Sequence, residues 1–478
     1  RALSIRREKS ATDDIELSHV LFNLASAHEK KGALSKSLEL HLESLRIRQG
    51  RLGDEHATVS NSVTAIGAVY QRFGNYDRAL DFYQKGLETR IKTLGPDHNN
   101  VAASYYTIGN LYSGMFNYHQ ALQYFQQGNR ILSMNSGGAN DILATYLAYT
   151  GRLYAKIGDH PSAVQYLKDA QAMAEKVLKK DHPYLAIVYN IAGDYYSDLQ
   201  DLSKANGYYS KAISIYRIAY GAASVREGDV YSKLGQTYAA SGDYDKALAT
   251  YNQALAIFDA KMGTRNVKSA STHHAAGIAL THQKRFPDAL ESYRKAFAAI
   301  SSNPDYLADP YVSPAFVDLE NEVLALRISA SKADAFYRWG ALPDAGRIEK
   351  LGMAMDSYDY AMQLIESISG EYNNENGRAE LEKQSRAVYS RGLNTAYDLY
   401  VLTGNTAHAE KAFSIAAKSK SALLLESMKD ERARTLAGVP DTLVSVERDL
   451  KIELAYHKNN LYVAQKAKDS ALIAVNEQ

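Results

Sequence analysis

One small residue recurs at a fixed interval through most of the chain. The interval is 42 residues, and the positions are Gly67, Gly109, Gly151, Gly193, Gly235 and Gly277. A second series follows twelve residues later, at Ala79, Ala121, Ala163, Ala205, Ala247 and Ala289. Small residues at matched positions let two helices pack closely, so two series with one period predict a tandem array of helix pairs.

The unit over 60–95 shows how each pair is built. Apolar residues at helical spacing predict a first helix over 63–73, and Gly74 interrupts it before a second helix starts near Tyr76. The glycine of the first helix and the alanine of the second allow their backbones to approach. The aromatic residue one turn after the alanine, here Tyr83, is expected to fill the space against the next unit.

Seven units of this kind can be placed before residue 302, and the earliest contains Ala25, Gly32 and His41. Their small residues and aromatics resemble the tetratricopeptide repeat, whose usual period is about 34 residues. The longer period and the Leu-Gly-Pro-Asp-His sequence at 94–98 resemble the kinesin-light-chain type. This resemblance implies an all-α fold, a right-handed superhelical solenoid of antiparallel helix pairs.

The repeat pattern changes after Ile300. We expect degenerate units with an insertion over 303–421, including a helix from Phe316 to Trp339 and a final unit that ends a helix at Gly404. The sequence Lys-Ser-Lys-Ser-Ala-Leu-Leu-Leu-Glu at 418–426 is similar to the segment that joins tetratricopeptide arrays to CHAT domains, the caspase-like peptidases of bacteria.

Three regions are therefore predicted. The regular array covers 1–302 and starts with a partial helix at Arg1–Lys9, the degenerate units cover 303–421, and a helical linker covers 422–478. Within the linker, 441–478 is expected to be a long amphipathic helix that can self-associate. Because the chain starts inside a helix, we treat it as a fragment, and a cytoplasmic location is only a default expectation.

Composition excludes several functions. The 55 Lys and Arg residues nearly balance the 54 Asp and Glu residues, which argues against general nucleic-acid or anionic-membrane binding. The absence of cysteine excludes disulfides, thiolate metal sites and a cysteine nucleophile within the chain. No apolar stretch approaches the roughly 20 residues that cross a bilayer. No cofactor is expected.

The first helices of such an array line its concave groove. With each glycine facing its partner helix, the residues three before it and one after it are expected to face the groove. The candidate partner-binding residues are Tyr106, Asn110, Arg152, Asn190, Asp194, Ser232, Gln236 and His274. Of these, Asn110, Arg152, Asn190 and Gln236 are the best candidates. An ordinary solvated helix face is the competing interpretation for each residue.

Other recurring residues are interpreted as structural. His56, His98 and His182 occupy one point of different units, too far apart to share a metal, so local capping is favoured. Tyrosines recur at 42-residue spacing from Tyr70 to Tyr238 and are expected to pack between helices, although stacking platforms for single-stranded RNA are the alternative. A basic cluster at Lys418, Lys420, Arg432 and Arg434 is expected to be a solvated helix face.

Three functional hypotheses follow. The first is a non-enzymatic scaffold that holds a peptide or helix of another protein in the groove. The second, implied by the CHAT resemblance, is the regulatory or sensor half of a cysteine protease whose catalytic domain lies beyond Gln478. The third, enzymatic activity of the array itself, needs an acid–base pair that residue spacing does not reveal. A clamp for acidic C-terminal tails is disfavoured, because Asp194 opposes such a ligand and the units adjacent to Arg152 offer no comparable cation.

Overall fold

A computed structural model of the chain describes residues 15–30, 34–72, 75–135, 141–302, 321–343, 346–369 and 375–419, with six further positions between 309 and 319. The chain divides into two compact units, Arg1–Ala409 and Glu410–Gln478. All the helix pairs below belong to the first unit. In the second unit, the described residues 410–419 are helical.

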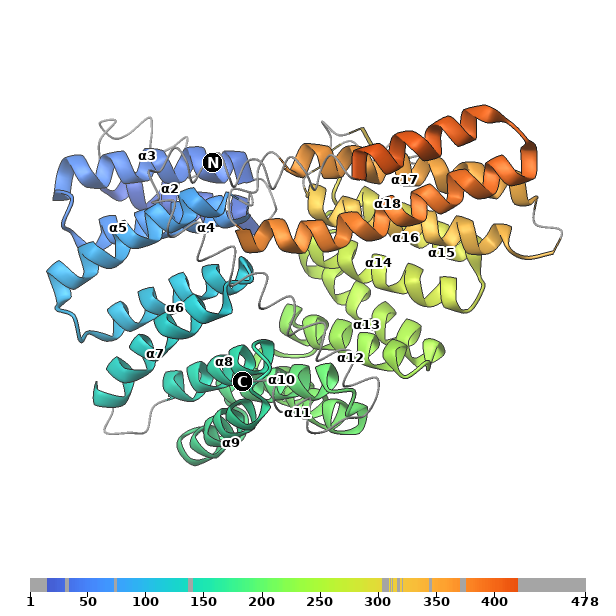
Figure 1. Cartoon of the computed structure of the whole chain (residues 1–478). Coiled ribbons are helices and arrows are strands. Elements are labelled where there is room, and N and C mark those ends of the chain that lie inside the picture. The colour runs from blue at the N-terminus through green and yellow to red at the C-terminus, as the bar shows by residue number, and fades with distance from the viewer. Residues whose placement is uncertain are drawn as a thin grey trace, which may run out of the picture. The chain divides into compact units, whose positions relative to one another are not determined.

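Seven helix pairs follow one another along the first unit (Figure 1). The first helices are α2 (Ile15–Lys30), α4 (Ala57–Arg72), α6 (Asn99–Gly114), α8 (Asp141–Lys156), α10 (Pro183–Asp198), α12 (Val225–Ala240) and α14 (Val267–His282). The second helices are α3 (Leu34–Leu52), α5 (Tyr76–Leu94), α7 (Tyr118–Asn135), α9 (His160–Val177), α11 (Leu202–Tyr220), α13 (Tyr244–Met262) and α15 (Phe286–Ala298). Each helix packs against its pair partner and against the neighbouring pair. The predicted solenoid of helix pairs is confirmed.

The helix ends repeat with the period of the sequence. Successive first helices start 42 residues apart and each has 16 residues. An Asp or Asn side chain accepts a hydrogen bond from a backbone N–H at the start of several second helices, as Asp159, Asp201 and Asp243 do for α9, α11 and α13. Such N-caps satisfy donors that have no partner within the helix, so they determine where each second helix begins.

Three further helices follow with a different spacing: α16 (Glu322–Gly340), α17 (Arg347–Ser369) and α18 (Glu375–Thr403). α16 packs mainly on α17, and α17 packs on α18. The helix expected from Phe316 begins at Glu322 instead, where the Asn321 side chain caps it. α18 ends before Gly404, as predicted, and this glycine has a φ of +66°.

The small residues of the two series meet inside each pair. A Cβ atom on Gly235 would lie 2.5 Å from Cε1 of Tyr251, and one on Gly67 would lie 3.2 Å from the carbonyl oxygen of Ala79. Real Cβ contacts are longer, so only glycine allows the ring to lie against the first helix. The aromatic residue therefore packs on the glycine of its own pair, whereas the sequence analysis assigned it to the gap before the next unit.

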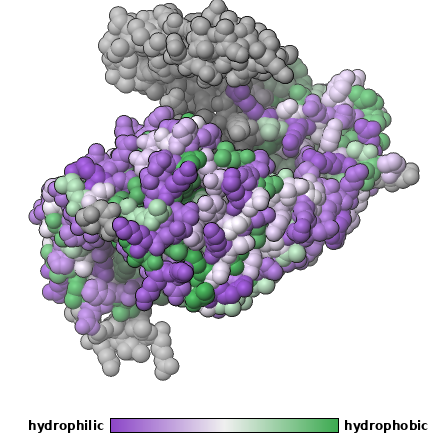
Figure 2. Space-filling model, turned by 90° about the horizontal axis from the view of Figure 1, so that it is seen from below, coloured by the Kyte–Doolittle hydropathy of each residue, from purple (hydrophilic) through white to green (hydrophobic). Residues whose placement is uncertain are grey.

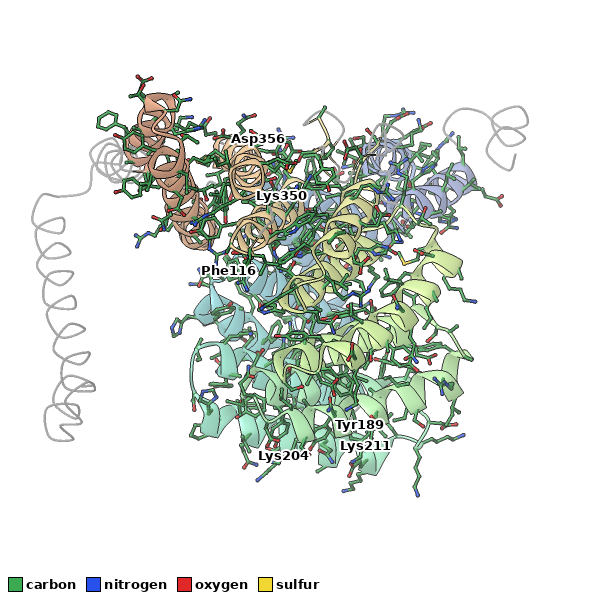
Figure 3. All side chains as sticks on the ribbon, turned by 90° about the vertical axis from the view of Figure 1, so that its right-hand side faces the viewer. Phe116, Tyr189, Lys204, Lys211, Lys350 and Asp356 are labelled. Carbon is green, nitrogen blue, oxygen red and sulfur yellow. The ribbon has the colours of Figure 1, made fainter. Side chains whose placement is uncertain are left out.

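The recurring tyrosines pack between helices, as predicted. Tyr70, Tyr112, Tyr154 and Tyr196 are partly buried against the core clusters. Tyr196 stacks on Tyr208 with ring centroids 5.5 Å apart and planes 5° apart. The Lys211 ammonium lies 5.2 Å from the centre of the neighbouring Tyr189 ring (Figure 3). The stacked rings join the two helices of a pair at one edge.

Some sequence predictions lie outside the described residues. They concern the partial helix at 1–9, Gly32, Gly74, the joint at 303–308 and the segment 420–478, including Lys420, Arg432 and Arg434. The first helix predicted over 63–73 starts earlier, at Ala57. The boundaries predicted at 302 and 421 stay predictions, and residues on both sides of 302 belong to the first unit.

The first pair has a more polar core than the others. Ala25 takes the glycine position and His41 the ring position, and both are fully buried. Within the described part of the chain, neither His41 ring nitrogen has a hydrogen-bond partner, and the ring meets Phe22 edge-on at 4.9 Å. Burial, followed by the positive charge of Arg48, lowers the pKa of His41 to about 4. The imidazole is therefore neutral in the folded chain near neutral pH.

We predict that Gly235→Ala destabilises the array by about 1–3 kcal/mol, because the added methyl group would collide with the Tyr251 ring. Gly207 provides a matched control: it is exposed within α11 and has nothing within 4 Å of its Cβ position. Gly207→Ala should stabilise by about 0.5–1 kcal/mol. Urea denaturation followed by circular dichroism measures both, and equal effects of the two substitutions would contradict the packing described here.

We predict that acid weakens the first pair through His41. Between a pKa of about 6.5 in the unfolded chain and about 4 in the folded chain, only the unfolded chain binds a proton at this position. The free energy of unfolding should therefore fall as the pH is lowered across this interval. His41→Leu should make the urea midpoint less dependent on pH in that range, while His119→Leu, at an exposed position, should leave the dependence unchanged.

Candidate functional site

A cavity of 490 Å³ lies along the first helices of four consecutive pairs, α6, α8, α10 and α12. It is open to solvent, and most of its lining side chains are polar or charged. The lining residues are Asn110, Ser113, Gly114, Tyr118, Arg152, Lys156, Asp194, Ser197, Asp198, Tyr209, Lys233 and Gln236. We refer to this surface as the groove cavity.

The constant period explains why these residues meet. One side chain comes from the same position of each first helix, the residue after the glycine: Asn110, Arg152, Asp194 and Gln236. Because the pairs stack with equivalent orientation, equivalent positions line up across the array. Residues four and five after the glycine lie one turn further on the same helix face, and Lys156 and Asp198 occupy that row.

Asp194 is the most connected group of the groove cavity. Its carboxylate pairs with the Lys233 ammonium at 2.7 Å and accepts a hydrogen bond from the Tyr209 hydroxyl at 2.8 Å. Lys233 also donates to the Asn190 side chain at 3.2 Å. Burial, and then the charge of Asp194, raise the pKa of Tyr209, which keeps its hydroxyl a donor. This network ties α10 to α11 and α12.

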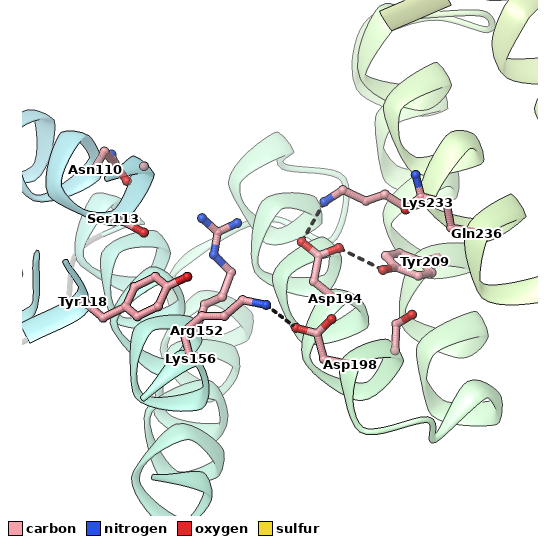
Figure 4. A pocket seen from close by; sticks show the side chains of 12 residues that line it. Asn110, Ser113, Tyr118, Arg152, Lys156, Asp194, Asp198, Tyr209, Lys233 and Gln236 are labelled. Carbon is pink, nitrogen blue, oxygen red and sulfur yellow. Dashed lines mark hydrogen bonds and ion pairs between the residues drawn. The ribbon is translucent and has the colours of Figure 1, made fainter. Parts of the chain in front are cut away.

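The opposite side of the groove cavity is more exposed. Lys156 pairs with Asp198 of the next pair at 2.8 Å, with both side chains about half exposed. The Arg152 guanidinium points into the cavity with Tyr118 on one side and Asp194 on the other (Figure 4). The guanidinium lies over the Tyr149 ring, with its Cζ atom 5.4 Å from the ring centre. No carboxylate among the described residues forms an ion pair with Arg152.

The groove cavity therefore offers paired charges, the Arg152 cation with no ionic partner among the described residues, and amide groups from Asn110 and Gln236. Arginine and amide side chains donate hydrogen bonds to carbonyl and carboxylate oxygens, and the amide oxygens accept from N–H groups. These are the groups that a peptide backbone and polar side chains present. The visible face in Figure 2 is largely hydrophilic, with apolar residues in scattered patches.

The structure separates the sequence-predicted residues into two groups. Asn110, Arg152, Asp194 and Gln236 line the groove cavity, and Asn190 reaches it through Lys233. Three others form internal contacts. Tyr106 is 2% exposed and packs on Gly128, His274 is 5% exposed and contacts Ser331, and Ser232 contacts Thr272. The position three before the glycine thus faces the neighbouring helices more than the groove.

Several residues that line the groove cavity were not predicted from the sequence. Ser113, Lys156, Ser197 and Asp198 lie one turn beyond the chosen position, and extending the same helix face by that turn would have found them. Lys233 carried no such signal, because it lies on another face of α12 and reaches the cavity through the length of its side chain. Lys156 and Lys233 also mean that Arg152 is accompanied by other cations.

The recurring histidines cap helices, as predicted. The Nδ1 atoms of His98 and His182 accept hydrogen bonds from the backbone N–H groups of Asn100 and Tyr184, and His56 does the same for Thr58. Within the described part of the chain, no group of three His, Asp or Glu residues is arranged to hold a metal ion. None of the described helices is both long and apolar enough to cross a membrane.

Comparisons with known proteins agree with the repeat architecture. A sequence profile of the tetratricopeptide repeat matches residues 14–92, 57–133, 141–218 and 226–302. None of the curated proteins matches the chain.

Solved structures that resemble the chain share little sequence with it. A putative kinesin light chain with nearly identical TPR-like repeats from Podosopora anserina is 18% identical, with 43% of this chain and 98% of that chain covered and a TM-score of 0.36. BtubC (BKLC) from P. vanneervenii is 19% identical, with 49% and 92% covered and a TM-score of 0.37. A signal transduction ATPase with a tetratricopeptide repeat sensor from Pyrococcus horikoshii is 14% identical, with 84% and 54% covered and a TM-score of 0.47.

We predict that the two lysine–aspartate pairs of the groove cavity differ in strength. A double-mutant cycle on Asp194→Ala and Lys233→Ala should give a coupling free energy of about 1 kcal/mol, since this pair is partly buried and shares a hydrogen-bond network. The same cycle on Asp198→Ala and Lys156→Ala, whose side chains are about half exposed, should give less than about 0.5 kcal/mol. Urea denaturation of the four proteins of each cycle provides both coupling free energies. A larger value for Lys156–Asp198 than for Lys233–Asp194 would contradict this prediction.

Proposed function

Because the chain belongs to the tetratricopeptide-repeat family, we propose that it binds a segment of a partner protein in the groove cavity. The repeat family indicates a scaffold for protein–protein interaction. The observation that carries the proposal is the row of polar side chains from Asn110 to Gln236, one from each first helix, with the Arg152 guanidinium lacking an ionic partner.

The geometry suits an extended segment. Packed helices lie about 8–10 Å apart, and an extended peptide rises about 3.3 Å per residue. One side chain per first helix can therefore meet every third residue of a peptide that crosses the helices. In this proposal Asn110 and Gln236 hydrogen-bond the peptide backbone, and Arg152 binds an oxygen of the partner segment. Asn190 helps to hold Lys233 at the edge of the cavity.

Asp194 and Ser232 have a different role in the proposal. Asp194 holds Lys233 in place and limits the positive charge of the groove cavity. Ser232 contacts Thr272 and stabilises the neighbouring helix. The buried residues Tyr106 and His274 are not proposed to touch the peptide. The CHAT sensor hypothesis stays a prediction, and the reading frame beyond Gln478 tests it.

We predict that peptides selected on the immobilised chain from a random display library bind the groove cavity. Asn110→Ala combined with Asn190→Ala should weaken binding of the selected peptides about tenfold or more, because Asn110 supplies hydrogen bonds to the backbone and Asn190 holds Lys233 in place. Fluorescence anisotropy with a labelled peptide measures the affinities.

The matched control is Gln123→Ala combined with Gln165→Ala. These residues are exposed and occupy equivalent positions of two units, but they belong to the second helices α7 and α9. The control should bind the peptides like the unmodified chain. If the Asn110 and Asn190 variant retains full affinity while the control loses it, the partner binds the outer helices and the proposal is wrong.

A further inference from the structure

A second cavity, of 670 Å³, is lined mainly by α14, α16 and α18. Its apolar wall includes Ile278, Val323, Leu326 and Val388. Ile278 and Val323 are more than a third exposed and leave apolar surface open to the cavity. Phe116, in the loop between α6 and α7, also lines the cavity and is 40% exposed (Figure 3).

Two arginines add positive charge to this apolar cavity. Arg391 of α18 lies 3.6 Å from the Asp334 carboxylate, which Arg338 also contacts at 2.7 Å, so the charge of Arg391 is only partly balanced. Arg327 of α16 is exposed, and no carboxylate among the described residues pairs with it. The cavity therefore carries positive charge beside apolar side chains, and Arg327 is its arginine with no carboxylate contact among the described residues.

The wall next to Arg327 is held by buried contacts. His274 Nε2 lies 2.9 Å from the Ser331 hydroxyl, which joins α14 to α16 one turn beyond Arg327. His274 is 5% exposed, and burial followed by the charge of Arg327 lowers its pKa to about 3. The imidazole is thus neutral near neutral pH, and Arg327 is the group that can attract an anion.

We propose that this cavity binds a small organic anion that has an apolar body and a single carboxylate group. The volume lies in the range of about 300–1,000 Å³ that is usual for small-molecule sites, and apolar walls with few polar groups are typical of them. The apolar body covers Ile278, Val323 and Phe116, and the carboxylate accepts two parallel hydrogen bonds from the Arg327 guanidinium. Arg327, which has no carboxylate contact among the described residues, provides the position for one carboxylate group.

This ligand site is separate from the proposed groove function. The two cavities share only Gly114 among their lining residues. The free small molecule is favoured over a protein segment because one carboxylate group meets the charge of Arg327 and the cavity volume fits a small apolar body.

Calorimetric titration of the full chain with octanoate tests the proposal. We expect saturable binding with one molecule per chain. Octanol keeps the apolar body but lacks the charge, so its affinity should be lower than that of octanoate by about tenfold or more. Arg327→Gln should lower the affinity for octanoate about tenfold or more. The affinity of Arg327→Lys should lie between those of the unmodified chain and Arg327→Gln, because an ammonium group keeps the charge but lacks the planar guanidinium fork.

Controls separate this site from the groove cavity. Arg152→Gln should leave octanoate binding unchanged, and unaltered circular dichroism of the Arg327 variants should show that they fold. The proposal is overturned if octanoate does not saturate, if octanol binds equally well, or if Arg327→Gln has no effect. It is also overturned if octanoate fails to bind while Arg327→Gln weakens the selected peptides, since the cavity then belongs to the peptide site.

Discussion

The contact between a glycine of the first helix and a ring of the second helix recurs through the array, and it allows the two helices of a pair to approach closely. Where the first helix has no Cβ atom, the ring of Tyr209 or Tyr251 lies directly on its backbone. The alanine one turn earlier lets its carbonyl group approach the same glycine. Both helices then lose side-chain volume at the same point, so they can pack closely without leaving a void.

The exceptions follow the same packing rule. Gly151 faces Leu167 in place of an aromatic ring, and the Leu167 Cγ atom would lie 3.1 Å from an added Cβ. In the first pair, Ala25 replaces the glycine and the smaller imidazole of His41 replaces the phenol. Within each pair, the residue at the glycine position of the first helix and the residue at the ring position of the second helix are therefore matched in size. In the first pair this match places an imidazole without hydrogen-bond partners in the core.

The groove cavity is lined by paired charges and the second cavity has apolar walls, and the repeat period accounts for this difference. Where the period is constant, equivalent positions align and neighbouring first helices form ion pairs, as Lys156 and Asp198 do. Where it ends, α16 starts 55 residues after α14 in place of 42. The surfaces of α14, α16 and α18 then no longer match as consecutive repeats do, and a cavity with apolar walls lies between them.

Local spacing alone determined the positions of the glycine and alanine series, the helix breaks and the capping role of His98 and His182, because these depend on side-chain size and on hydrogen bonds within a few residues. It also placed Arg152 in the groove. Only the tertiary structure decided that Tyr106 is buried and that Lys233 reaches Asp194. The burial of Tyr106 and the contact of Lys233 with Asp194 depend on how far a long side chain extends and on which neighbouring helix it meets. The repeat period contains no information on either point.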